Sequence, residues 1–413
     1  MTTQHCPITI EGARAILEDR VETISLTIEN GRIAAIDAAP GDGVRIDGRG
    51  LVLAPALIDI HGDAFERQMA PRPEAPMPLE IALLETDRQL AANGIATAYH
   101  ALTLSWEPGL RSVETGALVL DALRAAAPRM TVEHRVQLRW ETFCRDALPL
   151  IERELTAVPT PAIAFNDHTT TGMRGFDVPP ADRGWRPGAE RLAAPNDPRM
   201  ADRIAGLARR AGLTTEGYLA LQADVWARRD EVDADILRVA AMGRAAGAPM
   251  LSHDDCEPAM RAHFAELGAR ISEFPMDRAT AEEAKARGEW IVLGAPNALR
   301  GGSHIGSLDA ARMVAAGLCD ILASDYFYPA MLGAVGRLAA ETALTLPVIW
   351  ATVACNPAQA LGLTDRGAIK VGLRADLVLL DWPEGGTPVT RRLWVAGRPA
   401  YAAMPATDSV PSE

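Results

Sequence analysis

Cysteine is scarce in this sequence, and no two cysteines lie close together. The five are scattered over 413 residues, without a Cys-x-x-Cys pair, at Cys6, Cys144, Cys256, Cys319 and Cys355. This distribution excludes a disulfide framework and a zinc site built from paired thiolates. It is typical of proteins in a reducing compartment, so we expect a cytoplasmic protein.

Long apolar segments and an excess of positive charge are also absent. No run of about eighteen apolar residues occurs, so we expect no membrane span. The N-terminal segment lacks the basic start and the apolar core of a signal peptide. With a formal net charge of −13, the chain is not expected to bind nucleic acid or an anionic membrane. These absences favour a small-molecule partner, and an anionic one requires a local cluster of arginine or metal.

The middle of the chain alternates short apolar runs with helical stretches, which is the pattern of parallel βα units. Eight candidate strands can be distinguished: Val52–His61, Ile95–Leu104, Thr131–Glu141, Ala162–His168, Pro249–His253, Ala269–Phe274, Trp290–Gly294 and Cys319–Ser324. Helical patterns lie between most of them. Eight such units in about 300 residues predict an α/β fold, a (β/α)8 barrel like that of triosephosphate isomerase (a TIM barrel).

The two ends of the chain carry a different pattern. Residues 1–50 and 359–413 consist of short alternating strands separated by turns, and we expect them to form one small β-sandwich domain together. Residues 51–358 then form the barrel domain. Residues 172–247 interrupt it between the fourth and fifth strands, and their periodicity after a Pro/Gly-rich start predicts an insertion of two or three helices.

Side chains that can bind metal stand at the ends of the predicted barrel strands. His61 and Asp63 end the first strand with i, i+2 spacing, so their side chains project the same way. Further candidates at other strand ends are Glu141, His168, His253 and Asp325. Catalytic residues of such barrels lie at the carboxyl ends of the strands. Imidazoles and carboxylates gathered there predict a hydrolytic centre with one or two divalent metals.

Each of these residues also has an ordinary structural interpretation. A histidine at a strand end often hydrogen-bonds a loop, and Asp325 suits a helix N-cap. Glu141 has Arg139 and Arg145 as partners for a surface ion pair. The coincidence of six such residues at strand ends favours the metal site. The remaining histidines fit no metal spacing and are expected to pack or to face solvent: His5, His100, His134 and His263.

Longer motifs resemble the amidohydrolase superfamily, whose members are metal-dependent barrels with a β-sandwich built from both termini. They are ALIDIHGD at the first strand, ASDY at the eighth and NPAQALGLTDRGAIKVGLRADLVLLD near the end. More narrowly, HGDAFERQMAPRP, NDHT, SHDD, EFPM and GAPNALRGGSH are similar to a diphosphatase family of the carbon–phosphorus lyase pathway. That family hydrolyses α-D-ribose 1-methylphosphonate 5-triphosphate to the 5-phosphate and pyrophosphate, so the resemblance implies a role in phosphonate catabolism.

The resemblance also raises the question of how two metals would be bridged. Many superfamily members use a carboxylated lysine of a barrel strand, but Lys285 lies in a helical stretch and Lys370 in the C-terminal β segment. A carboxylate must therefore bridge, and Glu141 is the candidate. Asp325 is expected to orient the attacking water and accept its proton. The expected metal ligands are His61, Asp63, Glu141, His168, His253 and Asp325, with zinc as the first choice and manganese or iron as alternatives.

A triphosphate substrate requires local positive charge in this acidic protein. Arginine forks match phosphate oxygens in pairs, and glycine-rich turns bring backbone N–H groups close to an anion. Aspartates next to His253 are expected to hydrogen-bond ribose hydroxyls or to support the metal ligands. The expected substrate-binding residues are Arg174, Asp254, Asp255, Arg300, Gly301, Gly302 and His304.

Two departures from the motifs of the diphosphatase family leave the substrate open. This chain has HGDAFERQ where that family has HTDNLEKH, and Thr-Thr-Gly-Met follows NDHT in place of Pro-Gly-Gln. The alternative is hydrolysis of an amide, a cyclic amide or an N-acetyl group. A metal-free barrel that serves as an assembly protein is a third interpretation, which the intact set of ligands disfavours. A homodimer is the expected assembly of such an enzyme.

Overall fold

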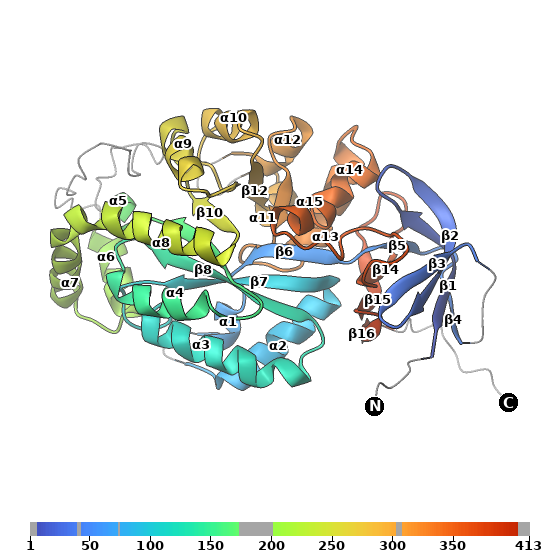
Figure 1. The fold of residues 1–413 in the computed structure, drawn as a ribbon, viewed down its shortest axis with the longest axis horizontal. Coiled ribbons are helices and arrows are strands. Elements are labelled where there is room, and N and C mark those ends of the chain that lie inside the picture. Colours follow the sequence, from blue (N-terminus) through green and yellow to red (C-terminus); the bar gives the residue numbers. More distant parts are fainter. Residues whose placement is uncertain (1–5, 39–42, 73–74, 173–200, 303–307, 404–413) are drawn as a thin grey trace.

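The computed structural model of the chain describes residues 6–38, 43–72, 75–172, 201–302 and 308–403. Two predicted substrate-binding residues, Arg174 and His304, lie outside these ranges. The strands form two sheets, a central one covered by helices and a second one at one end of the molecule (Figure 1). None of the helices in the described ranges combines the length and apolarity needed to cross a bilayer.

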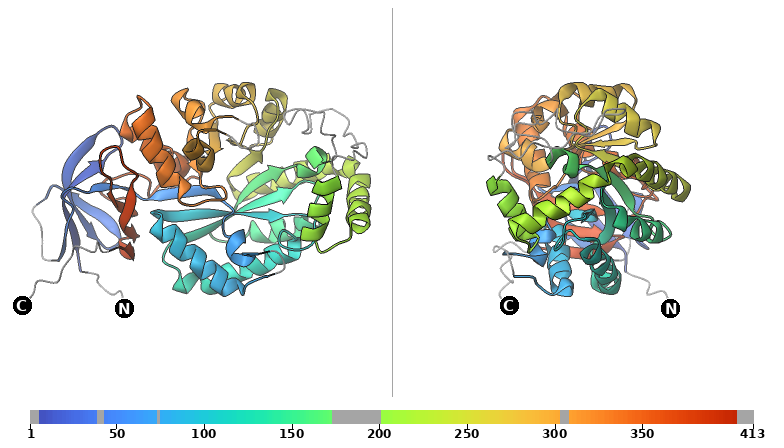
Figure 2. Two further views of the ribbon diagram at one scale, coloured as in Figure 1. Left: turned by 180° about the vertical axis from the view of Figure 1, so that it is seen from behind. Right: turned by 90° about the vertical axis from the view of Figure 1, so that its left-hand side faces the viewer.

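The central sheet is a nearly closed barrel of eight parallel strands in chain order. An isolated parallel bridge between Gly62 and Asp325 brings the first and the last strand together. Seen from one end, the strands are surrounded by helices (Figure 2). The strands are β6 (Leu57–Gly62), β7 (Ile95–Leu104), β8 (Glu133–Glu141), β9 (Ala162–Asn166), β10 (Met250–His253), β11 (Ile271–Glu273), β12 (Trp290–Gly294) and β13 (Ile321–Ala323). The predicted α/β barrel is therefore confirmed.

Burial on both faces explains why these strands read as continuous apolar runs. All ten residues of β7 are buried, because helices cover the outside of the barrel and side chains fill its interior. The helices between β6 and β9 are α1 (Glu66–Met69), α2 (Leu79–Ala92), α3 (Val113–Ala126) and α4 (Leu148–Glu154). Those after β10 are α9 (Pro258–Glu266), α10 (Arg278–Ala286), α11 (Ala295–Arg300), α12 (Ala310–Ala315), α13 (Ala330–Glu341), α14 (Leu346–Ala351) and α15 (Cys355–Ala360).

The described residues between β9 and β10 form four further helices, three of which lie within the predicted insertion. They are α5 (His168–Gly172), α6 (Ala201–Arg210), α7 (Thr215–Ala227) and α8 (Val232–Ala246). Local sequence sets their ends: the side chain of Thr214 caps the start of α7 by accepting the Gly217 N–H. Helix α8 ends at Gly247, whose φ of 65° suits glycine. The helical character expected after residue 198 is thus present.

The second sheet contains strands from both ends of the chain. Its order is β16–β15–β14–β5–β1–β2–β3, and β4 pairs with β1. The strands are β1 (Ile8–Ile16), β2 (Val21–Glu29), β3 (Arg32–Ile36), β4 (Val44–Asp47), β5 (Val52–Pro55), β14 (Leu377–Asp381), β15 (Val389–Val395) and β16 (Arg398–Ala402). Terminal segments far apart in the sequence therefore share one apolar core.

One predicted strand is wrong, because the structure divides Val52–His61 into two strands of different sheets. Residues of β5 pair with β1 and β14, whereas β6 pairs with β7 in the barrel. Both strands are buried at every position, so hydrophobicity gives no signal where the chain changes sheet.

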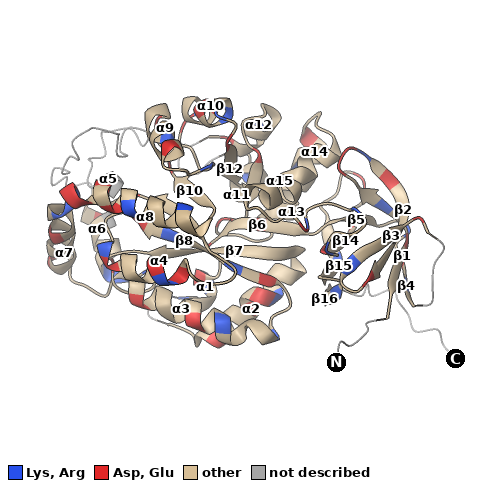
Figure 3. Ribbon diagram, in the orientation of Figure 1, with Lys and Arg blue, Asp and Glu red and all other residues tan. Residues whose placement is uncertain are grey.

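Charged residues of both signs are mixed along outer helices such as α2, α3 and α4 (Figure 3). A cluster of charged residues at the start of β8 joins the barrel to the C-terminal segment. Glu133 accepts hydrogen bonds from Arg366 and Arg374, two residues of the segment that leads into β14. Arg366 also donates to the Thr97 hydroxyl of β7 at 2.9 Å. This cluster therefore fastens the C-terminal segment to the amino-terminal end of the barrel.

Replacing Glu133 with Gln should destabilise the protein in a pH-dependent way. Burial raises the pKa of Glu133, but Arg366 and Arg374 outweigh it and lower the pKa to about 2, from an ordinary 4.5. The ion pair thus adds stability above pH 4.5 and loses it as the pH falls towards 2. We expect the variant to lose about 1–2 kcal/mol of unfolding free energy at pH 7, measured by urea denaturation.

The difference from the native chain should shrink between pH 4.5 and 2. Glu282→Gln is the matched control, because its ion pair with Arg278 is exposed and is worth less than about 1 kcal/mol at any pH. An equal loss at pH 7 and pH 3 would contradict the proposed role of Glu133.

Candidate metal centre

Three groups of side chains with metal-binding atoms lie at the mouth of the barrel, the face at which the strands reach their carboxyl ends. Within each group the donor nitrogen and oxygen atoms lie within 4.8 Å of one another. The groups are His61, His253 and Glu273; His168, His253 and Asp254; and His61, Asp63 and Asp325. The structure therefore brings together five of the six predicted ligands in these groups, from strands far apart in sequence.

Glu273, the last residue of β11, joins two of the histidines. Its side chain is fully buried, with Oε1 3.0 Å from His61 Nδ1 and Oε2 2.8 Å from His253 Nδ1. Gln137 of β8 donates a third contact to Oε1 at 2.9 Å. Burial raises the pKa of Glu273, but the two imidazoles outweigh it and hold the pKa well below its usual range. An ionised carboxylate therefore lies at the centre of the site, accepting the Nδ1 proton of His253.

These atoms fit a divalent metal. The buried Nδ1 atom of His61 has no hydrogen-bond partner in the described part of the chain, although Glu273 Oε1 is 3.0 Å away. A short contact without hydrogen-bond alignment is typical of two ligands that face a shared cation. Mixed imidazole and carboxylate donors suit zinc, iron or manganese. Glu273 can act as a ligand itself or as the acceptor that orients both rings.

Glu141 lies beside His168 and is in none of the three groups. Its Oε1 atom is 3.0 Å from His168 Nδ1, and its Oε2 atom accepts the His168 backbone N–H at 3.1 Å. Asn166 also donates to this carboxylate. Burial lowers the pKa of His168, but Glu141 and Asp254 outweigh it and raise the pKa to about 9. Glu141 thus has the geometry of a residue that orients His168, and its bridging role stays a prediction.

The alternative ion pairs considered for Glu141 are not formed in the described structure. Arg145 pairs with Glu231 and Asp235 instead. Arg139 reaches the metal-binding groups: its guanidinium donates to His253 Nε2 at 2.8 Å and lies 3.8 Å from Asp63 Oδ2. A buried guanidinium in this position supplies positive charge among the carboxylates.

Strained backbone marks the ends of three strands at this mouth. Asp254, Phe274 and Asp325 have φ values of 59°, 53° and 54°, which place them in the left-handed region. They lie just after β10, β11 and β13. The ring of Phe274 packs edge-on against His61 and His253, with centroids 5.1 and 5.2 Å apart. Such clustered strain is typical of functional sites.

Asp325 lines a cavity of about 290 Å³ together with His61, Asp63, His253 and Arg139. Its backbone fixes it against β6, because its N–H donates to the His61 carbonyl and its carbonyl accepts the Asp63 N–H, both at 2.9 Å. Burial raises the pKa of the Asp325 carboxyl to about 6. The carboxylate therefore stands where it can accept a proton from a water held among these groups.

Of the predicted substrate-binding residues that the structure describes, some line this cavity and others do not. Asp254 lines the cavity and its Oδ2 atom is 3.3 Å from His168 Nε2. Asp255 is fully buried and pairs with Arg261 at 3.1 Å, so the geometry gives no support to contact with substrate. Helix α11 contributes Asn297 to the cavity, whereas the residues at its end do not line it: Arg300, Gly301 and Gly302.

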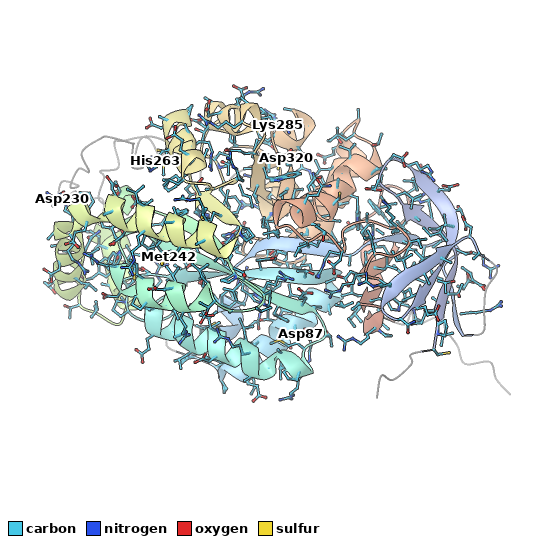
Figure 4. All side chains as sticks on the ribbon, viewed as in Figure 1. Asp87, Asp230, Met242, His263, Lys285 and Asp320 are labelled. Atoms are coloured by element: carbon cyan, nitrogen blue, oxygen red, sulfur yellow. The ribbon has the colours of Figure 1, made fainter. Side chains whose placement is uncertain are left out.

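The described histidines that are expected to pack lie outside the metal-binding groups, and His5 lies outside the described residues. His263 belongs to the outer helix α9, and Lys285 of α10 pairs with Asp320 at 2.8 Å (Figure 4). His100 and His134 form a buried chain with Asp87, in which His134 contacts His100 at 2.8 Å and Asp87 at 3.0 Å. Lys285 is thus excluded as a bridging ligand.

Sequence reasoning missed two residues of this centre, Glu273 and Arg139. Glu273 is the next-to-last residue of the predicted strand Ala269–Phe274, stands within the EFPM motif and ends β11 in the structure, so the strand-end rule identifies it once the strand is ended one residue earlier. Arg139 lies two residues before Glu141 on β8 and projects to the same side, but an arginine beside metal ligands follows no spacing rule.

The chain is similar to known hydrolases. The alpha-D-ribose 1-methylphosphonate 5-triphosphate diphosphatase of Escherichia coli (strain K12) is 33% identical over 376 residues, which cover 90% of this chain and 94% of that protein. No protein-family model matches the chain. Molinate hydrolase has a similar structure, with a TM-score of 0.62 at 15% identity over 99% of this chain and 100% of that one. D-hydantoinase has a TM-score of 0.59 at 13% identity, with 95% of each chain covered.

The barrel and the sheet from both termini form the fold of solved amidohydrolases, and the donor groups at the strand ends are those expected of a metal-dependent hydrolase. The solved structures support the shared fold alone, since their identities are low. The 33% identity over nine-tenths of this chain shows more than the fold. The chain belongs to the family of the alpha-D-ribose 1-methylphosphonate 5-triphosphate diphosphatases.

Replacing Glu273 with Gln should weaken metal binding about 10- to 100-fold, because the amide carries no charge and presents only one acceptor oxygen to the two imidazoles. The measurement is metal titration of the purified variant by calorimetry, supported by elemental analysis. Glu85→Gln on α2, which removes a charge from an exposed ion pair with Arg88, should bind metal like the native chain. Unchanged affinity in Glu273→Gln would show that this carboxylate has no part in the centre.

Proposed function

We propose that the protein hydrolyses a phosphoanhydride bond of a ribose 5-triphosphate and releases pyrophosphate, with α-D-ribose 1-methylphosphonate 5-triphosphate as the substrate in phosphonate breakdown. The observation that supports this most is the set of imidazoles and carboxylates at the barrel mouth of a chain 33% identical to the Escherichia coli diphosphatase. Zinc is the metal we propose, because imidazole and carboxylate ligands with an open position suit it.

The residues of the centre divide into those that would hold the metal, one that accepts a proton and one that stabilises negative charge. His61, Asp63, His168, His253 and Asp254 would hold the metal, which supplies a water of lowered pKa and polarises the phosphoryl oxygen. Asp325 orients the attacking water through one carboxylate oxygen and takes its proton. The Arg139 guanidinium is positioned to stabilise negative charge that develops on the phosphoryl oxygens.

The direct test offers two kinds of substrate to the metal-loaded protein. Ribose 5-triphosphate and ATP report phosphoanhydride hydrolysis through pyrophosphate release, which a coupled phosphate assay detects. Hydantoin and N-acetyl amino acids report the alternative chemistry through new amine or carboxylate groups. Pyrophosphate from the triphosphates supports the proposal, whereas turnover of the amides without pyrophosphate would overturn it.

Replacing Asp325 with Asn should leave the metal bound and reduce turnover by about 10²–10⁴-fold, because the amide cannot accept a proton. Asn also tolerates the left-handed backbone at this position, so the variant is expected to fold. Elemental analysis and pyrophosphate release are measured on the same preparation. Near-native turnover in the metal-loaded variant would remove Asp325 from the mechanism.

A further inference from the structure

A second cavity lies beside the metal centre. It has a volume of about 220 Å³ and is lined by the loop after β7 and by helices α6 and α7. Glu141 and His168 line it from the metal side, and Arg111 lines both this cavity and the one that contains Asp325. The two cavities are therefore neighbours that share Arg111 as a lining residue.

Two aromatic rings form part of the wall. Trp106 and Tyr218 lie with centroids 5.8 Å apart and planes inclined by 41°. Trp106 donates its Nε1 hydrogen to the Thr169 hydroxyl at 2.9 Å, and Tyr218 donates its hydroxyl to Glu107 at 2.5 Å. These bonds fix both rings, so the wall is built before a ligand arrives. Rigid aromatic walls with a few polar groups are typical of ligand pockets.

A buried hydroxyl without a partner lies in the same cavity. Thr103 of β7 is 3% exposed, and its Oγ1 atom has no hydrogen-bond partner in the described structure. Thr103 pairs in register with Arg139 of β8, whose side chain enters the barrel mouth, so both project to the same face. Because an unmade hydrogen bond in a buried place is costly, this hydroxyl is suited to a polar group of a ligand.

The charges of the cavity decide the class of ligand. The carboxylates of Glu107 and Glu141 line it, and they attract hydrogen-bond donors and repel anions. Arg111 is held by Glu66 in a two-pronged pair with a shortest contact of 2.8 Å, and Arg210 is an exposed residue of α6. Cavities for drug-sized molecules measure about 300–1,000 Å³, so this smaller one fits a single ring.

We propose that this cavity binds the hydroxyl-bearing sugar ring of the substrate, with Thr103 and Trp106 as the residues that select for it. The inference rests on the proposed function, and it deepens that function by assigning the sugar and the phosphate chain to different cavities. The phosphate chain lies at the metal centre, and the sugar ring stacks beside Trp106 while a hydroxyl group bonds Thr103.

The test uses ribose 5-phosphate, which has the ring and 5-phosphate of one product, and pyrophosphate, the other product, because only the first carries the ring. Binding of ribose 5-phosphate and of inorganic pyrophosphate to the metal-loaded protein is measured by calorimetry. Thr103→Val removes the hydroxyl at constant shape, and Trp106→Leu removes the ring. We expect each to weaken ribose 5-phosphate binding about three- to tenfold and to leave pyrophosphate binding unchanged. Thr390→Val is the control, a buried threonine of β15 whose hydroxyl also lacks a partner in the described structure.

The outcomes separate this inference from the function on which it rests. Unchanged ribose 5-phosphate binding in both variants, or an equal loss for both ligands, would overturn the assignment while the diphosphatase proposal stands. Failure of the native protein to bind either ligand would overturn both. If one variant does not fold, the other decides, since they remove different groups from the same cavity.

Discussion

The metal centre and the barrel interior depend on one buried carboxylate, that of Glu273. It faces two imidazoles and an amide from three other strands, which compensates for the cost of removing its charge from water. Because the two imidazoles come from β6 and β10, the same contacts fix the spacing of the strands and the orientation of the rings. Removing Glu273 would leave His61 and His253 without the negative charge that they face, so the core and the chemistry are coupled through this residue.

A second buried acidic residue joins two strands where the barrel closes. Asp59 of β6 is fully buried and accepts hydrogen bonds from the backbone and the hydroxyl of Ser324, at 3.0 and 2.5 Å, just after β13. Asp325 is the next residue, so the bond that joins the first and last strands also places the predicted proton acceptor. Barrel closure and positioning of the predicted proton acceptor thus depend on the same contacts, which explains why two acidic residues are tolerated in a hydrophobic interior.

Most of the fold could be predicted, because hydrophobic periodicity marks the strands and helices of a barrel, and turn residues such as glycine and proline mark their ends. The rule that catalytic side chains end barrel strands also identified His61, Asp63, His168, His253 and Asp325. Where the chain changes sheet within Val52–His61 could not be predicted, since burial is uniform on both sides of the change. The role of Arg139 could not be predicted either, because its contact with His253 depends on how two strands are staggered, and sequence does not encode stagger locally.

The departure of HGDAFERQ from HTDNLEKH bears on substrate choice. Aligned without gaps, the two motifs share His61, Asp63 and Glu66, and Glu66 holds Arg111, which lines both cavities. Two of the differing positions are Ala64 and Phe65, which are buried, and Phe65 packs edge-on against His100 at 5.1 Å. The differences at these two positions therefore fall on packing inside the barrel, while the residues that face the cavities are kept. On this reasoning the differences at Ala64 and Phe65 are no argument against a phosphorylated sugar.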